Sequence, residues 1–411
     1  MGFMEFFATQ KYDLGLLLIV VLWLVWYITR NKDKLHIQPV LKFARIHIVD
    51  MYLVKTGWGL KLMDSWANKY REWVKLFGYV SMGLGFIGIV VNFFLIGFMI
   101  KTLFAAPQTT QVGLVLPFTS IPGLGYLSFT HWIIAIFILA GIHEFAHGVV
   151  ARAHNVKVTN SGFAVLNIFK IPLIPAAFVE PDEKKFPKES DVVQYSVLTA
   201  GPLSNVFLSI VILLIMMFVL TPISNSITEP VGFSFAGINE TLPAGIAGLE
   251  AGMIYDRYNG ESVTDAQTLL LDLSYKKEPG DVVTIGYTDS ETSEVIDITV
   301  TTTSSPDDDT RAFLGVLGVT NEFAFIEAAK PYKGIFNWVR ELFFWMFIFN
   351  LSIGLINLMP LYITDGGQIT RVLLLKLYKE KKAMKLYHII CSFCLYVLLA
   401  ALFIPFLLGF F

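Results

Sequence analysis

The feature that most constrains this chain is a series of long apolar runs. They lie at about 14–28, 79–100, 132–152, 197–220, 335–358 and 386–410. Most of these runs are long enough to cross a bilayer as helices. Hydrophobic residues make up 55% of the chain and charged residues only 16%, which is too apolar for an ordinary soluble protein. The sequence therefore predicts a polytopic α-helical membrane protein with about six transmembrane helices.

The third run contains the sequence His143-Glu144-Phe145-Ala146-His147 near its end. On a helix the two histidines lie on one face, about 6 Å apart along the axis. This spacing suits two ligands of one zinc ion, and the glutamate between them is free to take a proton from a metal-bound water. Because ionisable side chains inside a bilayer are costly, the pattern indicates a functional site rather than a polar helix end.

A hydrolase zinc site needs a third protein ligand, and Asp365, which follows the run 335–358, is the best distant donor. Three motifs occur in order: His143-Glu144-x-x-His147, Gly201-Pro202-Leu203-Ser204-Asn205 and Asn357-x-x-Pro360-x-x-x-x-Asp365-Gly366. With them the chain resembles the site-2 proteases, which are zinc intramembrane proteases. The segment 178–183 also resembles the loop after the His helix of that family, and the likeness spans Thr130 to Gly367. Thr364 stands where the family usually has leucine.

The resemblance implies a set of residue roles. One Zn²⁺ per chain is expected on His143, His147 and Asp365, with Glu144 as the catalytic base. Asn357 is expected to hydrogen-bond the substrate carbonyl or the oxyanion. Asn205 is a weaker candidate for that role, since it could instead satisfy helix packing. Gly366 and Gly367 are expected to free the backbone that aims the aspartate.

Composition changes sharply in 229–330, which holds eighteen Asp and Glu but only five Lys and Arg. Pro243 to Met253, the following Asn259-Gly260 and the helical stretch Asp265 to Leu273 resemble a PDZ domain. Such an inserted α/β domain would bind a peptide by strand addition, or it would be a spacer without a ligand. The predicted divisions are 1–78, 79–220 with the His helix and a membrane-associated hairpin, the PDZ-like domain 221–330, and 331–411.

Charge predicts the topology. Residues 29–78 hold ten Lys and Arg against four Asp and Glu, and 371–386 are also basic, whereas 102–129 carry no charge. Since basic loops stay in the cytoplasm, both termini are expected outside the cell membrane. The metal site is then expected toward the cytoplasmic side, and the acidic PDZ-like domain is expected outside. The first run is expected to be retained, because its basic residues follow it.

Three further segments have patterns that predict their local structure. Aromatic residues recur every three or four positions in 58–77, which predicts an amphipathic helix, either at the membrane surface or packed on the bundle. The Pro/Gly-rich segment 102–129 is expected to be a plain outer loop or a re-entrant one. The strand-like segment 157–179 predicts a hairpin or sheet beside the site, where an edge could pair with an unwound substrate.

The most favoured function is a zinc-dependent intramembrane endopeptidase that cleaves the transmembrane segment of a membrane-anchored substrate after prior trimming. The alternatives are a membrane zinc carrier or an inactive PDZ scaffold. A carrier needs polar intramembrane ligands along a path, and few are present. The expected partners are the lipid bilayer, a transmembrane protein substrate and a peptide ligand of the PDZ-like domain, with no nucleic acid.

Overall fold

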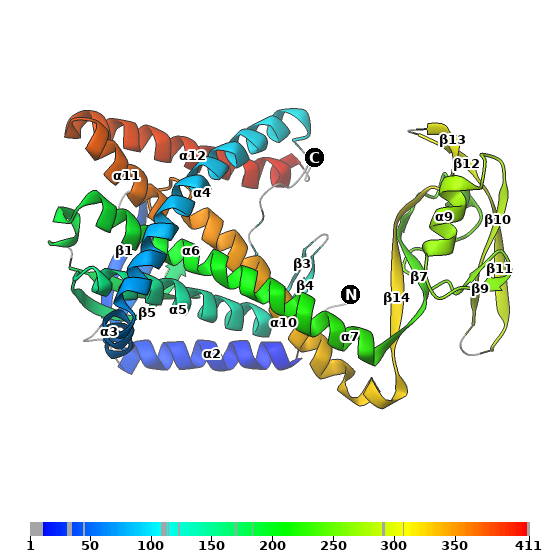
Figure 1. Ribbon diagram of the computed structural model, residues 1–411, viewed down its shortest axis with the longest axis horizontal. Helices are drawn as coiled ribbons and strands as arrows, with labels where there is room; N and C mark the ends of the chain where they lie inside the picture. The colour runs from blue at the N-terminus through cyan, green and yellow to red at the C-terminus, as the bar shows by residue number, and fades with distance from the viewer. Residues whose placement is uncertain are drawn as a thin grey trace. The chain divides into compact units, whose positions relative to one another are not determined.

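The computed structural model describes residues 11–30, 35–43, 46–107, 113, 115–121, 124–168, 171–182, 184–289, 292–306 and 308–408 (Figure 1). The chain divides into two compact units. The first comprises Met1–Met216 with Val339–Phe411, and the second comprises Met217–Trp338. Each unit is built around its own buried residues.

Six helical segments among the described residues are long and apolar enough to cross a membrane, which agrees with the number expected from the sequence. They are Lys11–Arg30, Arg71–Ala105, Phe129–Ala153, Asp191–Ile227, Glu327–Asn357 and Glu380–Pro405. The helices that form them are α2 (Lys11–Arg30), α4 (Arg71–Ala105), α5 (Phe129–Ala153), α6 (Asp191–Ile215), α10 (Lys333–Asn357) and α12 (Glu380–Leu408). Two shorter helices complete the first unit, α3 (Leu60–Lys69) and α11 (Asp365–Leu377).

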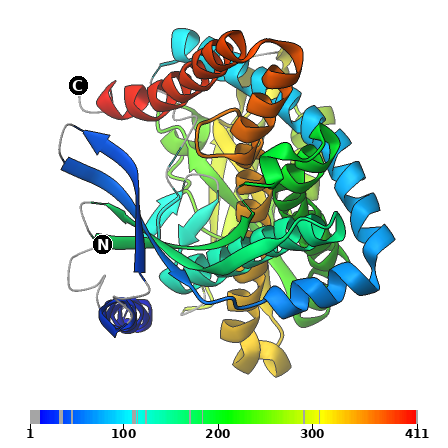
Figure 2. The same ribbon diagram turned by 90° about the vertical axis from the view of Figure 1, so that its left-hand side faces the viewer.

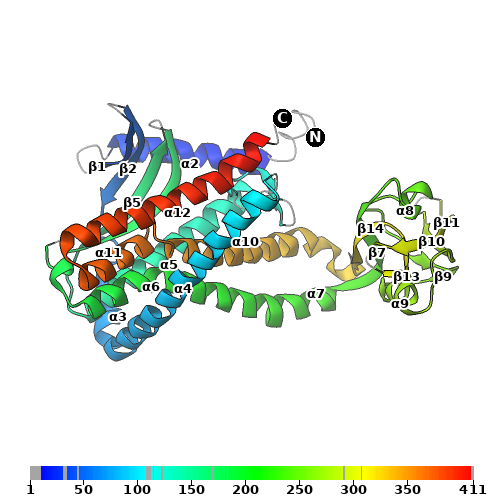
Figure 3. The ribbon, with the colours of Figure 1, turned by 90° about the horizontal axis from the view of Figure 1, so that it is seen from above.

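Helix α4 is longer than the expected second span, because it begins at Arg71 and continues to Ala105. The buried face of α4 carries glycines at the points where α6 and the residue after α10 come close to its backbone. A Cβ on Gly85 would lie 2.5 Å from Thr199 of α6, and one on Gly88 would lie 2.4 Å from Leu358. Small residues of this kind let transmembrane helices pack with their backbones close together. Figure 3 shows α4 crossing α6, with α12 alongside α4.

The amphipathic helix expected over 58–77 is divided at Tyr70, where the backbone leaves helical geometry (φ −117°, ψ 31°) between α3 and α4. Met63 and Ala67 of α3 are buried and pack against Val149 and Ala153 of α5. Part of this segment is therefore packed on the bundle, which is one of the two alternatives that the sequence predicted.

A four-stranded antiparallel sheet accompanies the helices of the first unit, with the order β1-β2-β5-β6 (Figure 2). Its strands are β1 (Leu35–Phe43), β2 (Ile46–Lys55), β5 (Val158–Ile168) and β6 (Ile171–Pro181). The hairpin expected in 157–179 is β5 with β6, whereas the basic segment 29–78 was not expected to supply two strands. Strand β6 is at an edge of the sheet and packs beside α5.

The segment 102–129 contains a short hairpin of β3 (Thr119–Ile121) and β4 (Gly125–Leu127), with Pro122 and Gly123 outside the described residues. The hairpin leads directly into α5. The Ser128 side chain caps that helix by accepting a hydrogen bond from the backbone N–H of His131 (3.2 Å).

The second unit is an α/β fold. Strands β7 (Thr228–Ile238) and β14 (Val316–Phe325) form one long antiparallel ladder. A second sheet has the order β11-β10-β8-β9 and a third pairs β12 with β13. The remaining elements are α7 (Thr221–Ile227), α8 (Pro243–Ile246), β8 (Arg257–Tyr258), β9 (Glu261–Ser262), α9 (Gln267–Tyr275), β10 (Val282–Thr288), β11 (Val295–Thr301), β12 (Thr303–Ser305) and β13 (Asp308–Phe313). The fully buried Phe233, Tyr255 and Ile285 lie at its centre. Its kinship with PDZ domains stays a prediction.

Candidate metal centre

The candidate site begins on α5, which presents His143 and His147 on one face. They are one helical turn apart, and both are buried, with 7% and 9% of their surface exposed. Their Nε2 atoms are 3.1 Å apart, so the two rings point to one spot. The helix thus brings the two predicted ligand atoms to one point.

Asp365 completes the group from far along the chain, at the first turn of α11. Its Oδ2 atom lies 3.2 Å from Nε2 of His143 and 3.4 Å from Nε2 of His147. Two nitrogens and one carboxylate oxygen thus converge at one place. These three residues form a group that could hold a metal ion.

The donor atoms fit a zinc ion. Ligands about 2.0–2.1 Å from one ion at tetrahedral angles lie roughly 3.3 Å from each other. The three separations of 3.1, 3.2 and 3.4 Å agree with that value. A set of two imidazoles and one carboxylate leaves a fourth position for water or substrate, as in hydrolytic zinc sites.

Helix α6 forms a wall of the site at Gly201. A Cβ at this position would lie 2.3 Å from Nε2 of His147 and 2.7 Å from Nε2 of His143. Any side chain would therefore occupy the place where the ligand atoms meet. Gly201 belongs to the motif Gly201–Asn205 in the sequence, but its closeness to both candidate ligands is visible only in the folded chain.

The second nitrogen of each imidazole is held by α6. Nδ1 of His147 is 2.7 Å from the carbonyl oxygen of Val197, to which it can only donate. Nε2 of His147 then carries the lone pair that a metal requires. The side-chain amide of Asn205 lies 3.1 Å from Nδ1 of His143 and is completely buried.

The amide of Asn205 has one unsatisfied atom, its oxygen, within the described part of the chain. A half-turn of the amide exchanges oxygen and nitrogen. In that orientation the oxygen accepts from Nδ1–H of His143, which satisfies the buried oxygen and frees Nε2 for a metal. The structure thus places Asn205 against a ligand, while its expected contact with substrate stays a prediction.

A compact turn between α10 and α11 positions Asp365. The Thr364 hydroxyl donates to the carbonyl of Met359 (2.6 Å) and accepts from the backbone N–H groups of Leu361 (3.3 Å) and Gly367 (3.2 Å). Thr364 is thereby the N-cap of α11. Thr364, which stands where the family usually has leucine, is therefore held in this turn by hydrogen bonds.

The role expected for the two glycines after Asp365 needs correction. Gly366 and Gly367 are helical and have no left-handed backbone, so conformational freedom is not the reason for them. A Cβ on Gly366 would lie 2.2 Å from the carbonyl oxygen of Leu358, and one on Gly367 would lie 1.8 Å from that of Leu361. Glycine is required because the preceding turn lies directly on the helix.

The other predicted residues lie around this group. Glu144 is half-buried and has the backbone of Val179 in β6 beside its carboxylate. Asn357 is the half-buried last residue of α10, and its side chain makes no hydrogen bond within the described residues. Two further histidines of the chain, His131 and His154, do not belong to this group.

One residue that sequence analysis overlooked is Asn92 of α4, which is 1% exposed. Its amide donates to the carbonyl oxygen of Leu355 (2.9 Å), near the end of α10, and to that of Gly88 (3.0 Å). A single asparagine within an otherwise apolar run was the available signal, because polar groups in a membrane need partners.

Comparison with known proteins decides the family. The sequence model of peptidase family M50 matches residues 131–402, which include all three candidate ligands. The chain belongs to peptidase family M50, the site-2 protease family. This M50 protein is also similar to the "Uncharacterized protein MJ0971" of Methanocaldococcus jannaschii. The two are 26% identical over 381 residues, which cover 89% of this chain and 87% of that protein.

Proposed function

We propose that this M50 protein is a zinc-dependent intramembrane endopeptidase that cleaves a transmembrane segment of a membrane-anchored substrate. The observation that carries the proposal is the convergence of His143, His147 and Asp365. These donors belong to a unit whose helices are long and apolar enough to cross a bilayer. Membership of a peptidase family makes peptide-bond hydrolysis the reaction that this arrangement supports best.

The protein's own residues divide the chemistry between them. A zinc ion on the three ligands would supply Lewis-acid polarisation of the scissile carbonyl and acidify the attacking water. Glu144, one residue after the first ligand, accepts the proton of that water and returns it to the leaving amine. Asn205 and the Val197 carbonyl hold the two imidazoles in the orientation that presents Nε2.

The substrate must be unwound before it is cleaved, because a helix hides its carbonyls in its own hydrogen bonds. Strand β6 is an edge strand, and Val179 within it lies beside Glu144. An unwound segment that adds to β6 would run past the catalytic base with its backbone extended. Asn357, whose amide is otherwise without a partner in the described chain, is then available to the substrate carbonyl or the oxyanion.

The proposal includes a topology. The basic segments 29–78 and 371–386 support a metal site toward the cytoplasm, with the acidic unit Met217–Trp338 outside the cell membrane. As a PDZ-like domain this unit would bind an extended peptide or limit which substrates approach. Substrates trimmed to short outer stubs would be favoured.

The decisive experiment combines metal analysis with a cleavage assay in detergent or vesicles. Purified protein should contain about one zinc per chain. His143→Ala and Asp365→Ala should lose the zinc, whereas Glu144→Gln should keep it and lose proteolysis. If Asp365→Ala bound zinc as tightly as the wild type, the third-ligand assignment would be wrong.

The same variants separate the proposal from its rivals. A zinc carrier or an inactive scaffold gives Glu144 no function, so Glu144→Gln would leave transport or peptide binding unchanged. Zinc-dependent cleavage that is lost in Glu144→Gln, with zinc still bound, excludes both rivals. Trapping membrane proteins on Glu144→Gln would then identify the substrate.

A further inference from the structure

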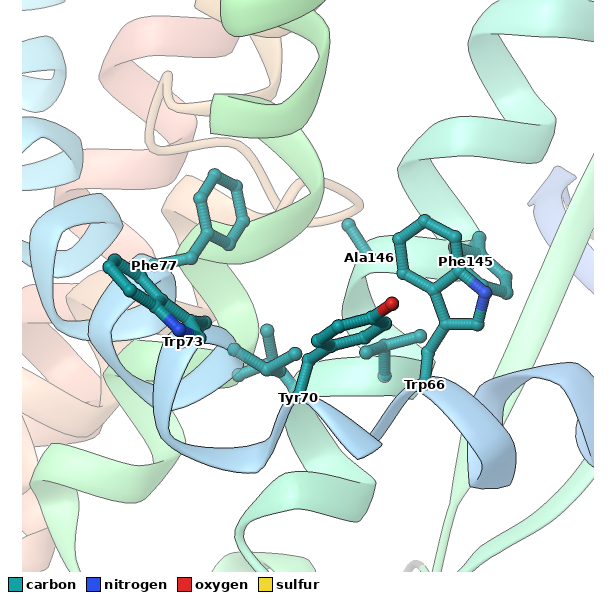
Figure 4. A pocket seen from close by; sticks show the side chains of 9 residues that line it. Trp66, Tyr70, Trp73, Phe77, Phe145 and Ala146 are labelled. Carbon is teal, nitrogen blue, oxygen red and sulfur yellow. The ribbon is translucent and has the colours of Figure 1, made fainter. Parts of the chain in front are cut away.

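A groove of about 470 Å³ lies between α3, the first turns of α4 and the C-terminal half of α5. Figure 4 shows Tyr70 between two aromatic pairs, one on each side of it. The lining is apolar and mainly aromatic, and its labelled members are Trp66, Tyr70, Trp73, Phe77, Phe145 and Ala146. This groove is separate from the metal centre, whose three ligands do not line it.

The break between α3 and α4 builds the groove. At Tyr70 the chain leaves helical geometry, so Trp66 of α3 and Trp73 of α4 project on opposite sides of this residue. Trp66 packs edge-on against Phe145 of α5, with ring centroids 5.8 Å apart. Even so, 49% of Trp66 and 74% of Trp73 remain exposed. Exposed Trp and Tyr rings on a membrane protein are typical of the bilayer interface.

A cation stands at the rim of the groove. The Lys69 ammonium lies 5.1 Å from the centre of the Tyr70 ring and pairs with no carboxylate among the described residues. The neighbouring cations are engaged: Lys75 pairs with Glu72 (3.3 Å), and Arg71 donates to the Asn155 side chain. Lys69 is therefore the rim cation that is available to an anion.

The position of the groove argues against a substrate helix as its occupant. At 3.6 residues per turn, Phe145, Ala146, Val149 and Val150 lie about 100–160° around α5 from Glu144. A chain in the groove would have α5 between itself and the catalytic base.

An acyl chain is narrow enough to lie along such a surface, and a lipid phosphate provides the negative charge that matches Lys69. We propose that the groove binds one anionic phospholipid, with an acyl chain on the aromatic lining and its phosphate at Lys69. This proposal rests on one part of the proposed function, namely that the protein lies in a bilayer. It depends on neither zinc nor proteolysis.

The test uses full-length protein in detergent, titrated with phosphatidylglycerol or phosphatidylcholine and observed by native mass spectrometry. One phosphatidylglycerol per chain should bind in preference to phosphatidylcholine. Lys69→Gln should weaken phosphatidylglycerol binding about fivefold, the typical effect of one lysine near anionic lipid. Lys61→Gln is the matched control, since Lys61 is exposed at the other end of the same helix, whereas Lys69 lies over the ring of the lining residue Tyr70. This variant should bind as the wild type does.

A second measurement locates the lipid. Phosphatidylglycerol with brominated acyl chains should quench tryptophan fluorescence less in Trp73→Phe than in the wild type. Val74→Phe narrows the groove and should reduce the binding of phosphatidylglycerol. Equal affinity for the two lipids, or equal losses in Lys61→Gln and Lys69→Gln, would overturn the proposal. So would a photo-crosslinker at position 73 that captured a substrate helix instead of lipid. Zinc content, measured in each variant, reports on the metal centre separately.

Discussion

Asn205 of α6 touches the far nitrogen of the ligand His143, with its amide 3.1 Å from Nδ1. The amide is fully buried, and its oxygen lacks a partner within the described chain unless it accepts from that nitrogen. This hydrogen bond would select which ring nitrogen faces a bound metal. We therefore propose that this asparagine positions a candidate metal ligand.

The first prediction concerns Asn205. Asn205→Leu removes the polar partner of Nδ1 and should weaken zinc binding roughly 10–100-fold, as loss of a partner of a metal-bound histidine typically does. Asn205→Asp keeps an acceptor for Nδ1–H and should bind zinc nearly as well as the wild type. Competition with a zinc chelator measures both. Weak binding by Asn205→Asp and tight binding by Asn205→Leu would reverse the assignment.

The second prediction tests the wall at Gly201. Because a Cβ there would lie 2.3 Å from Nε2 of His147, Gly201→Ala should lower zinc occupancy at least tenfold while the protein stays folded. Gly141→Ala on α5 is the control, since a Cβ at Gly141 meets nothing within 4 Å. Metal content and thermal unfolding are measured together. Full zinc occupancy in Gly201→Ala would show that the donor atoms meet elsewhere.

The third prediction concerns the Thr364 hydroxyl. Thr364→Val keeps the shape but loses the N-cap and the bond to Met359, so it should destabilise the protein by about 1 kcal/mol. Because Asp365 follows directly, zinc affinity should fall as well, and Thr364→Ser should restore both. Unfolding and chelator competition measure the two effects. A valine variant that matches the serine variant would make the hydroxyl irrelevant.

The fourth prediction is the topology. Single cysteines at Ser65 and Lys381 should resist a membrane-impermeant thiol reagent in intact cells, and one at Asp308 should react. All three positions are exposed in the structure, so burial in the fold does not explain protection. The native Cys391 and Cys394 are fully buried, which keeps the background low. Labelling at Lys381 with protection at Asp308 would invert the proposed arrangement.

The fifth prediction concerns the second unit. Thr228 pairs with Phe325 at the end of the β7–β14 ladder, so a short Gly/Ser linker can replace residues 229–324. All three candidate ligands lie in the first unit, and the deletion should leave zinc content unchanged. Cleavage of trimmed substrates should persist, and untrimmed substrates should become cleavable. Loss of both activities in a zinc-loaded variant would mean that the unit delivers substrate.

Sequence reasoning succeeded where chemistry or length leaves a strong mark. The long apolar runs predicted six helices able to span a membrane, and the spacing of His143 and His147 predicted that they share one face. The convergence of Asp365 on them was predicted from its chemistry and from a family resemblance. Buried ionisable groups are rare enough in apolar segments for such signals to be specific.

What the sequence concealed depends on packing. Strand β1 carries apolar residues at alternate positions, Leu35, Ile37, Leu41 and Phe43, which is a pattern typical of a strand. These residues were interpreted only as part of the basic segment 29–78, so the alternation was not used to predict a strand. The helix break at Tyr70 could not be predicted, because Tyr70 and its immediate neighbours include no proline or glycine. The Val197 carbonyl on His147 is a backbone atom, which no residue type reveals.

The separation of the ligands along the chain has a consequence for biosynthesis. The helix with His143, Glu144 and His147 leaves the ribosome long before Asp365. Asp365 is synthesised only after the entire second unit. Until α11 packs against α6, the early helix offers only two ligands, and zinc sites of this kind require three. A nascent chain that has not yet reached Asp365 would therefore lack a complete metal centre. Under the proposed function it could not cleave neighbouring membrane proteins before α11 is made.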